Sequence, residues 1–186
     1  MKTKIILHGG YASHKNEQND QFFKEILSTT KKVVNILLVY FAKESERVEV
    51  NREEDIFMFN KNNENKTLNF EVATEHFFVD QVKRADIVYL HGGTTLKILN
   101  TLKDFPNLKS MFEGKVIAGE SAGSYVLSSL FYSVKAGGIF EGLGFVPVKM
   151  ICHFSNEKKD KFEGLKDRNE LESLFLSDYE YKVFHI

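Results

Sequence analysis

The residues best suited to chemistry in this sequence surround Ser121. Residues 119–123 read Gly-Glu-Ser-Ala-Gly, a G-x-S-x-G pattern between an apolar run and a helix-like segment. Small residues beside a serine allow the sharp strand-to-helix turn that exposes its hydroxyl, and the N–H of the next residue, Ala122, then points at a developing oxyanion. The pattern predicts a nucleophilic serine. The plainer interpretation is a tight turn whose serine caps the helix.

A nucleophilic serine needs a base, and the sequence offers six histidines. His153 follows the strand-like run 146–152. The end of such a strand lies at the ligand crevice of an α/β sheet, so we expect His153 to be the base; the alternative is a half-buried histidine bonded to backbone. His8 and His91 each precede two glycines, so we interpret them as parts of turns. No histidine pair has metal-ligand spacing with a carboxylate, and we expect no metal.

Gly92 and Gly93 follow another apolar run, 86–90. Glycines there let the backbone approach a ligand, and a free N–H could supply a second oxyanion donor, although the pair could equally serve only the turn. Neither G-x-x-x-x-G-K-[ST] nor G-x-G-x-x-G occurs in the sequence. We therefore expect no nucleotide-phosphate cradle.

Predicted strands alternate with predicted helices along the chain, and these elements must position the residues described above. Strand-like apolar runs lie at 4–7, 33–41, 68–74, 86–90, 115–119 and 146–152. Helix-like segments lie at 19–32, within 43–59, at 75–84, from Thr94 or Thr95 through Leu102, and from the serine turn through Leu130. Repeated strand–helix units predict an α/β fold with parallel strands and right-handed crossovers.

Length and composition narrow the class of protein. With 186 residues, 42% of them hydrophobic and 27% charged, the chain is expected to form a single globular domain, 1–186. A net charge of -1 gives no reason to expect a nucleic acid or a membrane as a partner. One cysteine excludes an internal disulfide, and neither a spanning helix nor a signal peptide is evident, so we expect a soluble cytoplasmic protein.

Three segments of the sequence resemble the signature segments of the peptidase S51 family, which includes dipeptidase E and, more distantly, cyanophycinase. They are 90–96, 117–124 and 152–156. The family pattern is GGNT after a strand, G-x-S-A-G at the nucleophile, and a His-aromatic pair followed by Asn. The resemblance covers roughly the whole chain. It implies a flavodoxin-like sandwich, similar to class I glutamine amidotransferases, with a mostly parallel central sheet flanked by helices.

The resemblance also implies roles for individual residues. Ser121 matches the nucleophile, His153 its base, and Gly93 and Ala122 the backbone oxyanion donors. The implied reaction is hydrolysis of a small peptide after an N-terminal aspartate, without metal or cofactor. We expect a monomer or homodimer.

Substrate binding is expected at three further positions. Gly92 and Thr94 belong to the segment that resembles GGNT. Arg168 is the arginine best placed to bind an aspartyl carboxylate through a bidentate contact. A solvated surface arginine is the alternative.

The sequence departs from the family pattern in three places. The third member of the triad is expected within 131–138, which contains no carboxylate, so Glu141 is the nearest candidate acid. Thr94 replaces the asparagine of GGNT, and the chain stops at the strand-like segment 182–186, where typical members continue. Loss of the orienting acid costs serine proteases about 10⁴-fold in turnover.

Three other functions are alternatives to a serine peptidase. Without an orienting acid, the protein could be a weak or inactive relative that binds a small molecule or a partner. An α/β-hydrolase esterase is disfavoured because too few residues separate Ser121 from His153. A glutamine amidotransferase is disfavoured because its elbow carries a cysteine, whereas the only one here is Cys152.

Overall fold

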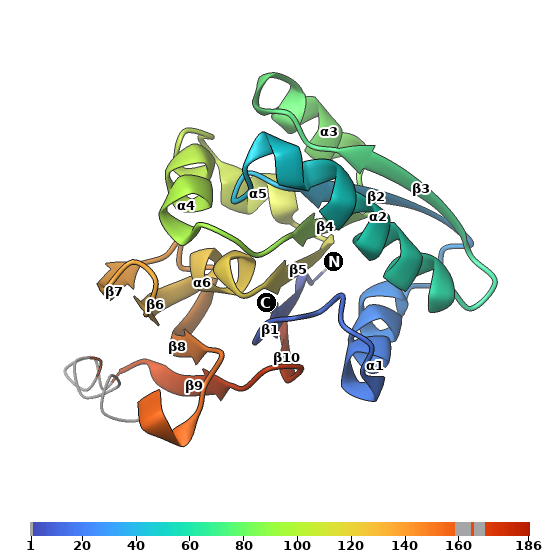
Figure 1. Ribbon diagram of the computed structural model, residues 1–186. Helices are drawn as coiled ribbons and strands as arrows, with labels where there is room; N and C mark the ends of the chain where they lie inside the picture. Colours follow the sequence, from blue (N-terminus) through green and yellow to red (C-terminus); the bar gives the residue numbers. More distant parts are fainter. Residues whose placement is uncertain (1, 159–164, 166–169) are drawn as a thin grey trace.

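The computed structural model describes residues 2–158, 165 and 170–186 (Figure 1). Its strands are β1 (Lys4–His8), β2 (Val33–Val39), β3 (Thr67–Val72), β4 (Ile87–Leu90), β5 (Val116–Glu120), β6 (Ser128–Ser133), β7 (Gly138–Glu141), β8 (Val146–Cys152), β9 (Glu172–Leu176) and β10 (Tyr181–His185). Its helices are α1 (Glu17–Leu27), α2 (Ser45–Lys61), the 3-10 turn η1 (Glu75–Phe77), α3 (Phe78–Arg84), α4 (Thr95–Lys103), α5 (Leu108–Phe112) and α6 (Ala122–Leu127).

The larger sheet has the order β10-β1-β5-β4-β2-β3, and all its strands are parallel except β10 at one edge. Leu7 and Leu90 are both in register with Gly119, so β1, β5 and β4 end side by side. The residues that follow these three ends are therefore brought to one edge of the sheet, as expected for parallel strands.

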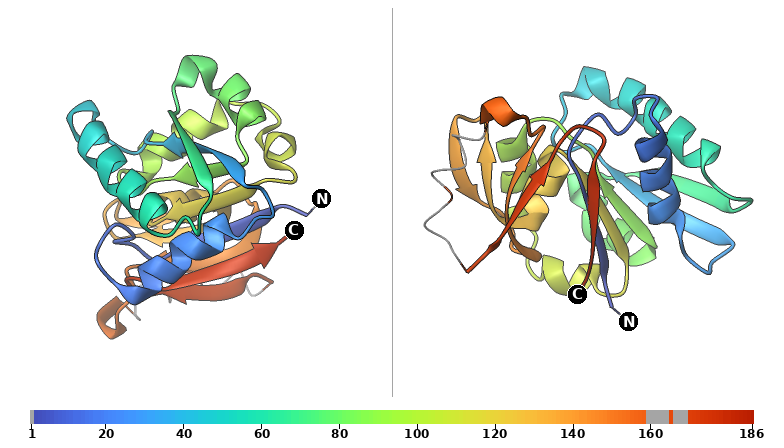
Figure 2. Two further views of the ribbon diagram at one scale, coloured as in Figure 1. Left: turned by 90° about the vertical axis from the view of Figure 1, so that its right-hand side faces the viewer. Right: turned by 90° about the horizontal axis from the view of Figure 1, so that it is seen from below.

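Helices cover both faces of this sheet, as the two views of Figure 2 show. On one face, α1 and α2 bury a cluster that includes Phe22, Phe23 and Phe59 against the strands. On the other face, α3 to α6 pack together with the second sheet around residues such as Phe78 and Phe112. The expected α/β sandwich with a mostly parallel central sheet is confirmed.

A second sheet, β7-β6-β8-β9, was not expected from the sequence. The helix after the serine turn was predicted to run through Leu130, but α6 ends at Leu127 and β6 begins at Ser128. The hydroxyl of Ser128 donates to the carbonyl of Tyr125 (2.8 Å) at the helix end. The strand then pairs with both β7 and β8, and this pairing outweighs the local preference for continuing the helix.

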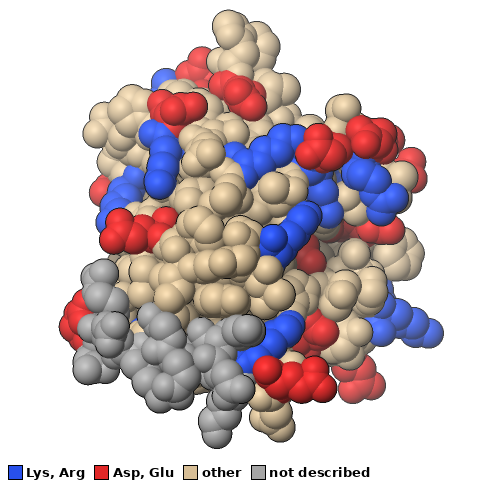
Figure 3. Space-filling model, turned by 60° about the vertical axis from the view of Figure 1, so that its left-hand side comes forward, with Lys and Arg blue, Asp and Glu red and all other residues tan. Residues whose placement is uncertain are grey.

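Charged side chains of both signs are interspersed over the face drawn in Figure 3. This distribution agrees with the net charge of -1. Among the described residues, no helix combines the length and apolar character needed to cross a membrane.

Candidate active site

Ser121 lies in the turn between β5 and α6, with φ 49° and ψ −104°. Left-handed backbone is unfavourable for a residue with a Cβ, and such strain is commonly stored at functional sites. The flanking glycines make the turn possible: a Cβ on Gly119 would lie 2.5 Å from the Gly123 carbonyl carbon, and a Cβ on Gly123 would overlap the carbonyl oxygen of Leu90. The turn thus presents the serine side chain above the sheet edge.

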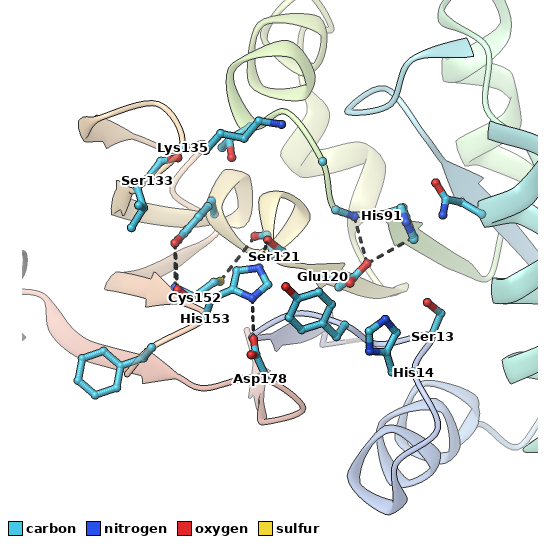
Figure 4. A pocket seen from close by; sticks show the side chains of 18 of the residues that line it. Ser13, His14, His91, Glu120, Ser121, Ser133, Lys135, Cys152, His153 and Asp178 are labelled. Atoms are coloured by element: carbon cyan, nitrogen blue, oxygen red, sulfur yellow. Dashed lines mark hydrogen bonds and ion pairs between the residues drawn. The ribbon is translucent and has the colours of Figure 1, made fainter. Parts of the chain in front are cut away.

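His153 and Asp178 extend from Ser121 as a linked pair (Figure 4). The Oγ atom of Ser121 lies 2.9 Å from Nε2 of His153, and Nδ1 of His153 lies 2.6 Å from Oδ1 of Asp178. His153 follows β8 and also has a positive φ, 51°. Hydroxyl, imidazole and carboxylate in this linkage are arranged for proton transfer from the serine.

The loop after β1 connects the histidine to the aspartate. The carbonyl of Gly9 accepts from the N–H of His153 (3.0 Å), and the carbonyl of Gly10 accepts from the N–H of Tyr179 (3.2 Å). The N–H of Gly9 donates to the carbonyl of Glu180 (2.8 Å). These bonds hold the β8–β9 and β9–β10 connections against one strand end.

Replacing Gly10 with alanine is expected to lower kcat/KM on any substrate of this site by about 100-fold. Gly10 has φ +139°, and an added Cβ would overlap the ring of His153, so the ring must leave its position 2.9 Å from Oγ of Ser121. A displacement of about 1 Å can cost a reaction about 10²-fold. The matched control is Gly137→Ala, which imposes a Cβ at φ +74° with no atom within 4 Å. Equal kcat/KM in Gly10→Ala and Gly137→Ala would contradict the expected displacement of the His153 ring.

A buried pair, His8 and Asn19, shapes the same loop. The N–H of Gly10 donates to Nδ1 of His8 (3.1 Å), so the neutral ring carries its proton on Nε2, 3.0 Å from Oδ1 of Asn19. The Asn19 amide donates in turn to the carbonyls of Tyr11 (2.7 Å) and His14 (2.8 Å). Burial lowers the pKa of His8 to about 4.

This pKa predicts a pH-dependent loss of stability. The unfolded chain binds a proton at His8 near pH 6.5, whereas the folded chain does so only near pH 4. The free energy of unfolding should therefore fall as the pH drops below 6.5, by about 2 kcal/mol at pH 5 from this residue alone. Urea unfolding at about pH 7.5 and 5 should show a smaller loss in His8→Gln than in wild type. His185→Gln, at an exposed position, should behave like wild type. An identical loss of unfolding free energy in all three proteins would show that His8 does not cause the pH dependence.

A cavity of about 920 Å³ opens beside Ser121 and His153. Its walls include Tyr11 from the loop after β1, Asn51 from α2 and Lys135 from the β6–β7 turn. Figure 4 shows Glu120 between Ser121 and His91 on the surface of this cavity. Ser121 therefore has space beside it for a small ligand.

His91, interpreted from sequence as part of a turn, belongs to a buried charged cluster. Its Nδ1 atom lies 3.0 Å from Oδ2 of Asp55 and 3.4 Å from Oε2 of Glu120. Neither contact meets the geometry of a hydrogen bond, so we describe both as electrostatic. Burial alone would lower the pKa of His91, but the charges of Asp55 and Glu120 outweigh it and raise the pKa. Burial raises the pKa of Asp55.

The expected oxyanion donors both lie next to the serine turn. Ala122 is the first residue of α6, so no carbonyl of that helix can accept its N–H. Gly93 has φ +151°, and a Cβ there would overlap the carbonyl oxygen of Ala42, so the position requires glycine. The N–H of Gly92 donates to Oε2 of Glu120 (3.3 Å).

The other expected site residues lie elsewhere. Thr94 is at the N-terminus of α4, where its hydroxyl accepts from Nζ of Lys135 (3.3 Å), and it does not line the cavity. The proposed acid Glu141 lies exposed at the end of β7, and the structure does not bring it to His153. β7 runs antiparallel to β6, whereas β8 runs parallel to β6, so β7 ends level with Lys149 and not at the end of β8 that His153 follows. Arg168 lies outside the described residues.

Asp178 is the residue that sequence reasoning missed. It follows β9, whose Leu174 and Leu176 are buried, and so repeats the pattern of a polar residue just after an apolar strand. That pattern had identified His153 and could have identified Asp178. Cys152 also lines the cavity, but burial raises the pKa of its thiol well above the usual value and keeps it protonated.

The chain is similar to known proteins in sequence family and in fold. The family model described as Peptidase family S51 matches residues 5–179. A crystal structure of a peptidase from an acI-B1 Actinobacterium is similar with a TM-score of 0.71 and 21% identity, over 99% of this chain and 84% of that one. A structure named "Putative Peptidase E Protein" from Listeria monocytogenes EGD-e has a TM-score of 0.71 and 16% identity, over 100% and 98% of the two chains. At these identities the two structures show a shared fold. None of the curated proteins matches the sequence.

Proposed function

The chain belongs to peptidase family S51, and we propose that it is a serine peptidase that hydrolyses small peptides with Ser121, His153 and Asp178. One observation carries the proposal: the serine hydroxyl, the imidazole and the Asp178 carboxylate form an unbroken chain of contacts of 2.9 and 2.6 Å. A carboxylate within hydrogen-bond distance of the His153 ring also favours an active peptidase over an inactive relative that only binds a small molecule or a partner.

In the proposed reaction, Oγ of Ser121 attacks the scissile carbonyl carbon while Nε2 of His153 takes the hydroxyl proton. The N–H groups of Gly93 and Ala122 stabilise the resulting oxyanion. His153 then gives its proton to the leaving amine, the C–N bond breaks, and an acyl-enzyme remains. Water, activated by the same imidazole, attacks the ester and releases the acid and free Ser121.

Asp178 fulfils the role for which Glu141 was considered. By accepting the Nδ1–H of His153, it holds the ring in the tautomer that leaves Nε2 free to take the serine proton. Its negative charge also stabilises the imidazolium that forms during attack. The order Ser, His, Asp along the chain differs from the Ser, Asp, His order of α/β-hydrolases, which disfavours the esterase alternative.

A peptide with an N-terminal aspartate is the first substrate to test. Lys43 and Arg47, from the loop before α2 and from α2 itself, line the cavity and present positive charge to a carboxylate. They are candidates for this contact in addition to Arg168, which lies outside the described residues.

The test couples hydrolysis to chemical modification of the serine. Aspartyl dipeptides are incubated with the protein before and after graded reaction with a small fluorophosphonate, with intact mass giving the labelled fraction. We expect hydrolysis to fall in direct proportion to the fraction labelled. Hydrolysis that persists in fully labelled protein would refute a serine mechanism.

A further inference from the structure

The strand order places different groups on the two sides of Ser121. Ser121 follows β5, which lies between β1 and β4 in the larger sheet. Gly93, a proposed oxyanion donor, lies after β4, whereas the loop after β1 contacts His153. Figure 4 accordingly shows His153 and Asp178 on one side of Ser121 and His91, the residue after β4, on the other. Because the imidazole passes its proton to the leaving amine, the leaving residue of a substrate belongs on the β1 side.

Tyr11 is the aromatic residue that the loop after β1 presents to this side of the cavity. It is 46% exposed and lines the cavity wall. The centre of its ring lies 5.1 Å from that of His153, with the two planes at 68°. His14 stacks against the same ring, with the centres 4.8 Å apart and the planes at 20°. A half-exposed aromatic ring therefore lies directly beside the base of the triad.

Hydrogen bonds fix the backbone of Tyr11 before any ligand binds. Its carbonyl accepts from the N–H of His14 (3.1 Å) and from the side-chain amide of Asn19 (2.7 Å). The N–H of the next residue, Ala12, donates to Oε1 of Glu120 (3.2 Å). A ring held in this way loses little conformational entropy when a ligand packs against it.

Tyr11 also occupies a backbone conformation that costs free energy. Its φ is 59°, in the left-handed region that residues with a Cβ avoid, and Ser121 and His153 share a positive φ. Glycine adopts this conformation at lower cost. A half-exposed ring gains less from burial than a core residue does, so stability of the fold does not explain a tyrosine here. Contact between the ring and a ligand does explain it.

We propose that Tyr11 packs against the side chain of the leaving residue, so that the enzyme prefers peptides with an aromatic residue directly after the scissile bond. This inference rests on the proposed peptidase function and assigns its specificity for the second residue of the substrate.

A leaving side chain can reach the ring. During proton transfer the leaving nitrogen lies about 3 Å from Nε2 of His153, and the Cβ of the leaving residue is two bonds, about 2.5 Å, further on. That carbon therefore lies within about 5.5 Å of the imidazole, which has the Tyr11 ring as its neighbour at 5.1 Å. Aromatic rings interact at centre-to-centre distances of about 4.5 to 7 Å. An aromatic leaving side chain in the cavity is consequently within contact distance of Tyr11.

The charges on this side of the cavity give little reason to select a charged leaving side chain. Asp178 and Lys158 are opposite in sign, and both already bond to His153. Glu157 lines the same wall but is exposed, so water and salt screen its charge. The exposed ring of Tyr11 is the feature that remains to discriminate between leaving residues.

The experiment compares the dipeptides Asp-Phe, Asp-Lys and Asp-Gly as substrates of wild type, Tyr11→Ala and Tyr11→Phe. The three dipeptides share the acyl residue and the terminal carboxylate, so they differ only in the leaving side chain. Wild type should cleave Asp-Phe with a kcat/KM about 10-fold above that for the other two. Tyr11→Ala should lose this preference, mainly through a higher KM for Asp-Phe. Tyr11→Phe keeps the ring and should keep the preference.

Two controls separate contact with the leaving residue from other roles of Tyr11. Phe57→Ala removes an exposed aromatic ring of α2 that lies outside the cavity wall, and it should keep the wild-type ratio of Asp-Phe to Asp-Gly. Fluorophosphonate labelling needs the triad but no leaving amino acid, so Tyr11→Ala should slow labelling far less than it slows hydrolysis of Asp-Phe. If Tyr11 only positions His153, labelling and the hydrolysis of all three dipeptides slow together, and the proposal fails.

Two further results would overturn the proposal: an unchanged ratio of Asp-Phe to Asp-Gly in Tyr11→Ala, or a wild type that prefers Asp-Gly or Asp-Lys. Calorimetric binding of Asp-Phe and Asp-Gly to Ser121→Ala gives a readout that does not require hydrolysis. Tighter binding of Asp-Phe, lost in Ser121→Ala/Tyr11→Ala, would support the aromatic contact even if wild type hydrolysed neither dipeptide, a result that rejects the peptidase function alone. Equal binding of the two dipeptides to Ser121→Ala would reject this inference.

Discussion

Replacing Asp178 with asparagine is expected to lower kcat on a peptide substrate by about 10³-fold. The asparagine amide can donate to Nδ1 of His153 and so favour the wrong tautomer, which in serine proteases costs about 10⁴-fold. The Asp178 side chain is 40% exposed, so water partly replaces its effect and the loss should be smaller. Steady-state kinetics on the peptide that wild type hydrolyses would measure the decrease in kcat.

Glu141→Gln is the control for this substitution. It removes the carboxylate that the sequence favoured, and because Glu141 is exposed on β7, its kcat should stay within about twofold of wild type. A large loss in Glu141→Gln together with an active Asp178→Asn would contradict the triad.

Replacing Ser121 with alanine is expected to reduce kcat by about 10⁶-fold, the loss seen when a serine nucleophile is removed from a comparable triad. The described hydrogen bonds give the Ser121 hydroxyl one partner, His153, so the change leaves the scaffold intact. Alanine keeps the same backbone strain at φ 49°, so the melting temperature should shift by no more than a few degrees.

Ser155→Ala is the matched control, because Ser155 lines the same cavity at an exposed position. Its kcat should be close to that of wild type. Residual activity in Ser121→Ala at the level of Ser155→Ala would show that another group performs the reaction.

The sequence predicts those strands and helices whose conformation follows from their own residues. Apolar runs such as 33–41 and 86–90 can be buried on both faces only as central strands, and they became β2 and β4. The first three residues of β6, 128–130, were predicted as helix because they follow a helical segment without a break. The strand conformation of β6 depends on its pairing with β7 and β8. Those contacts form only in the folded chain, so the residues of β6 alone do not reveal it.

The same distinction separates the site residues that could be predicted from those that could not. Ser121 and His153 lie in short patterns whose turn geometry is local. The pattern of a polar residue after an apolar strand also marks Asp178, but its contact with His153 could not be predicted. That contact exists because β9 runs parallel to β8, with Leu176 in register with Cys152, and no spacing in the sequence reveals that register. The role of His91 in a charged cluster cannot be predicted from its own segment, because its partner Asp55 lies on a helix far earlier in the chain.

The most direct test of the triad is the rate and site of fluorophosphonate labelling, followed by intact mass and peptide mapping. The account predicts a single adduct, on Ser121, that forms rapidly in wild type and Glu141→Gln. In Asp178→Asn and His153→Ala the adduct should form at least about 100-fold more slowly, because the hydroxyl loses its oriented base. An adduct on another residue, no adduct on folded wild type, or equal rates in wild type and Asp178→Asn would contradict it.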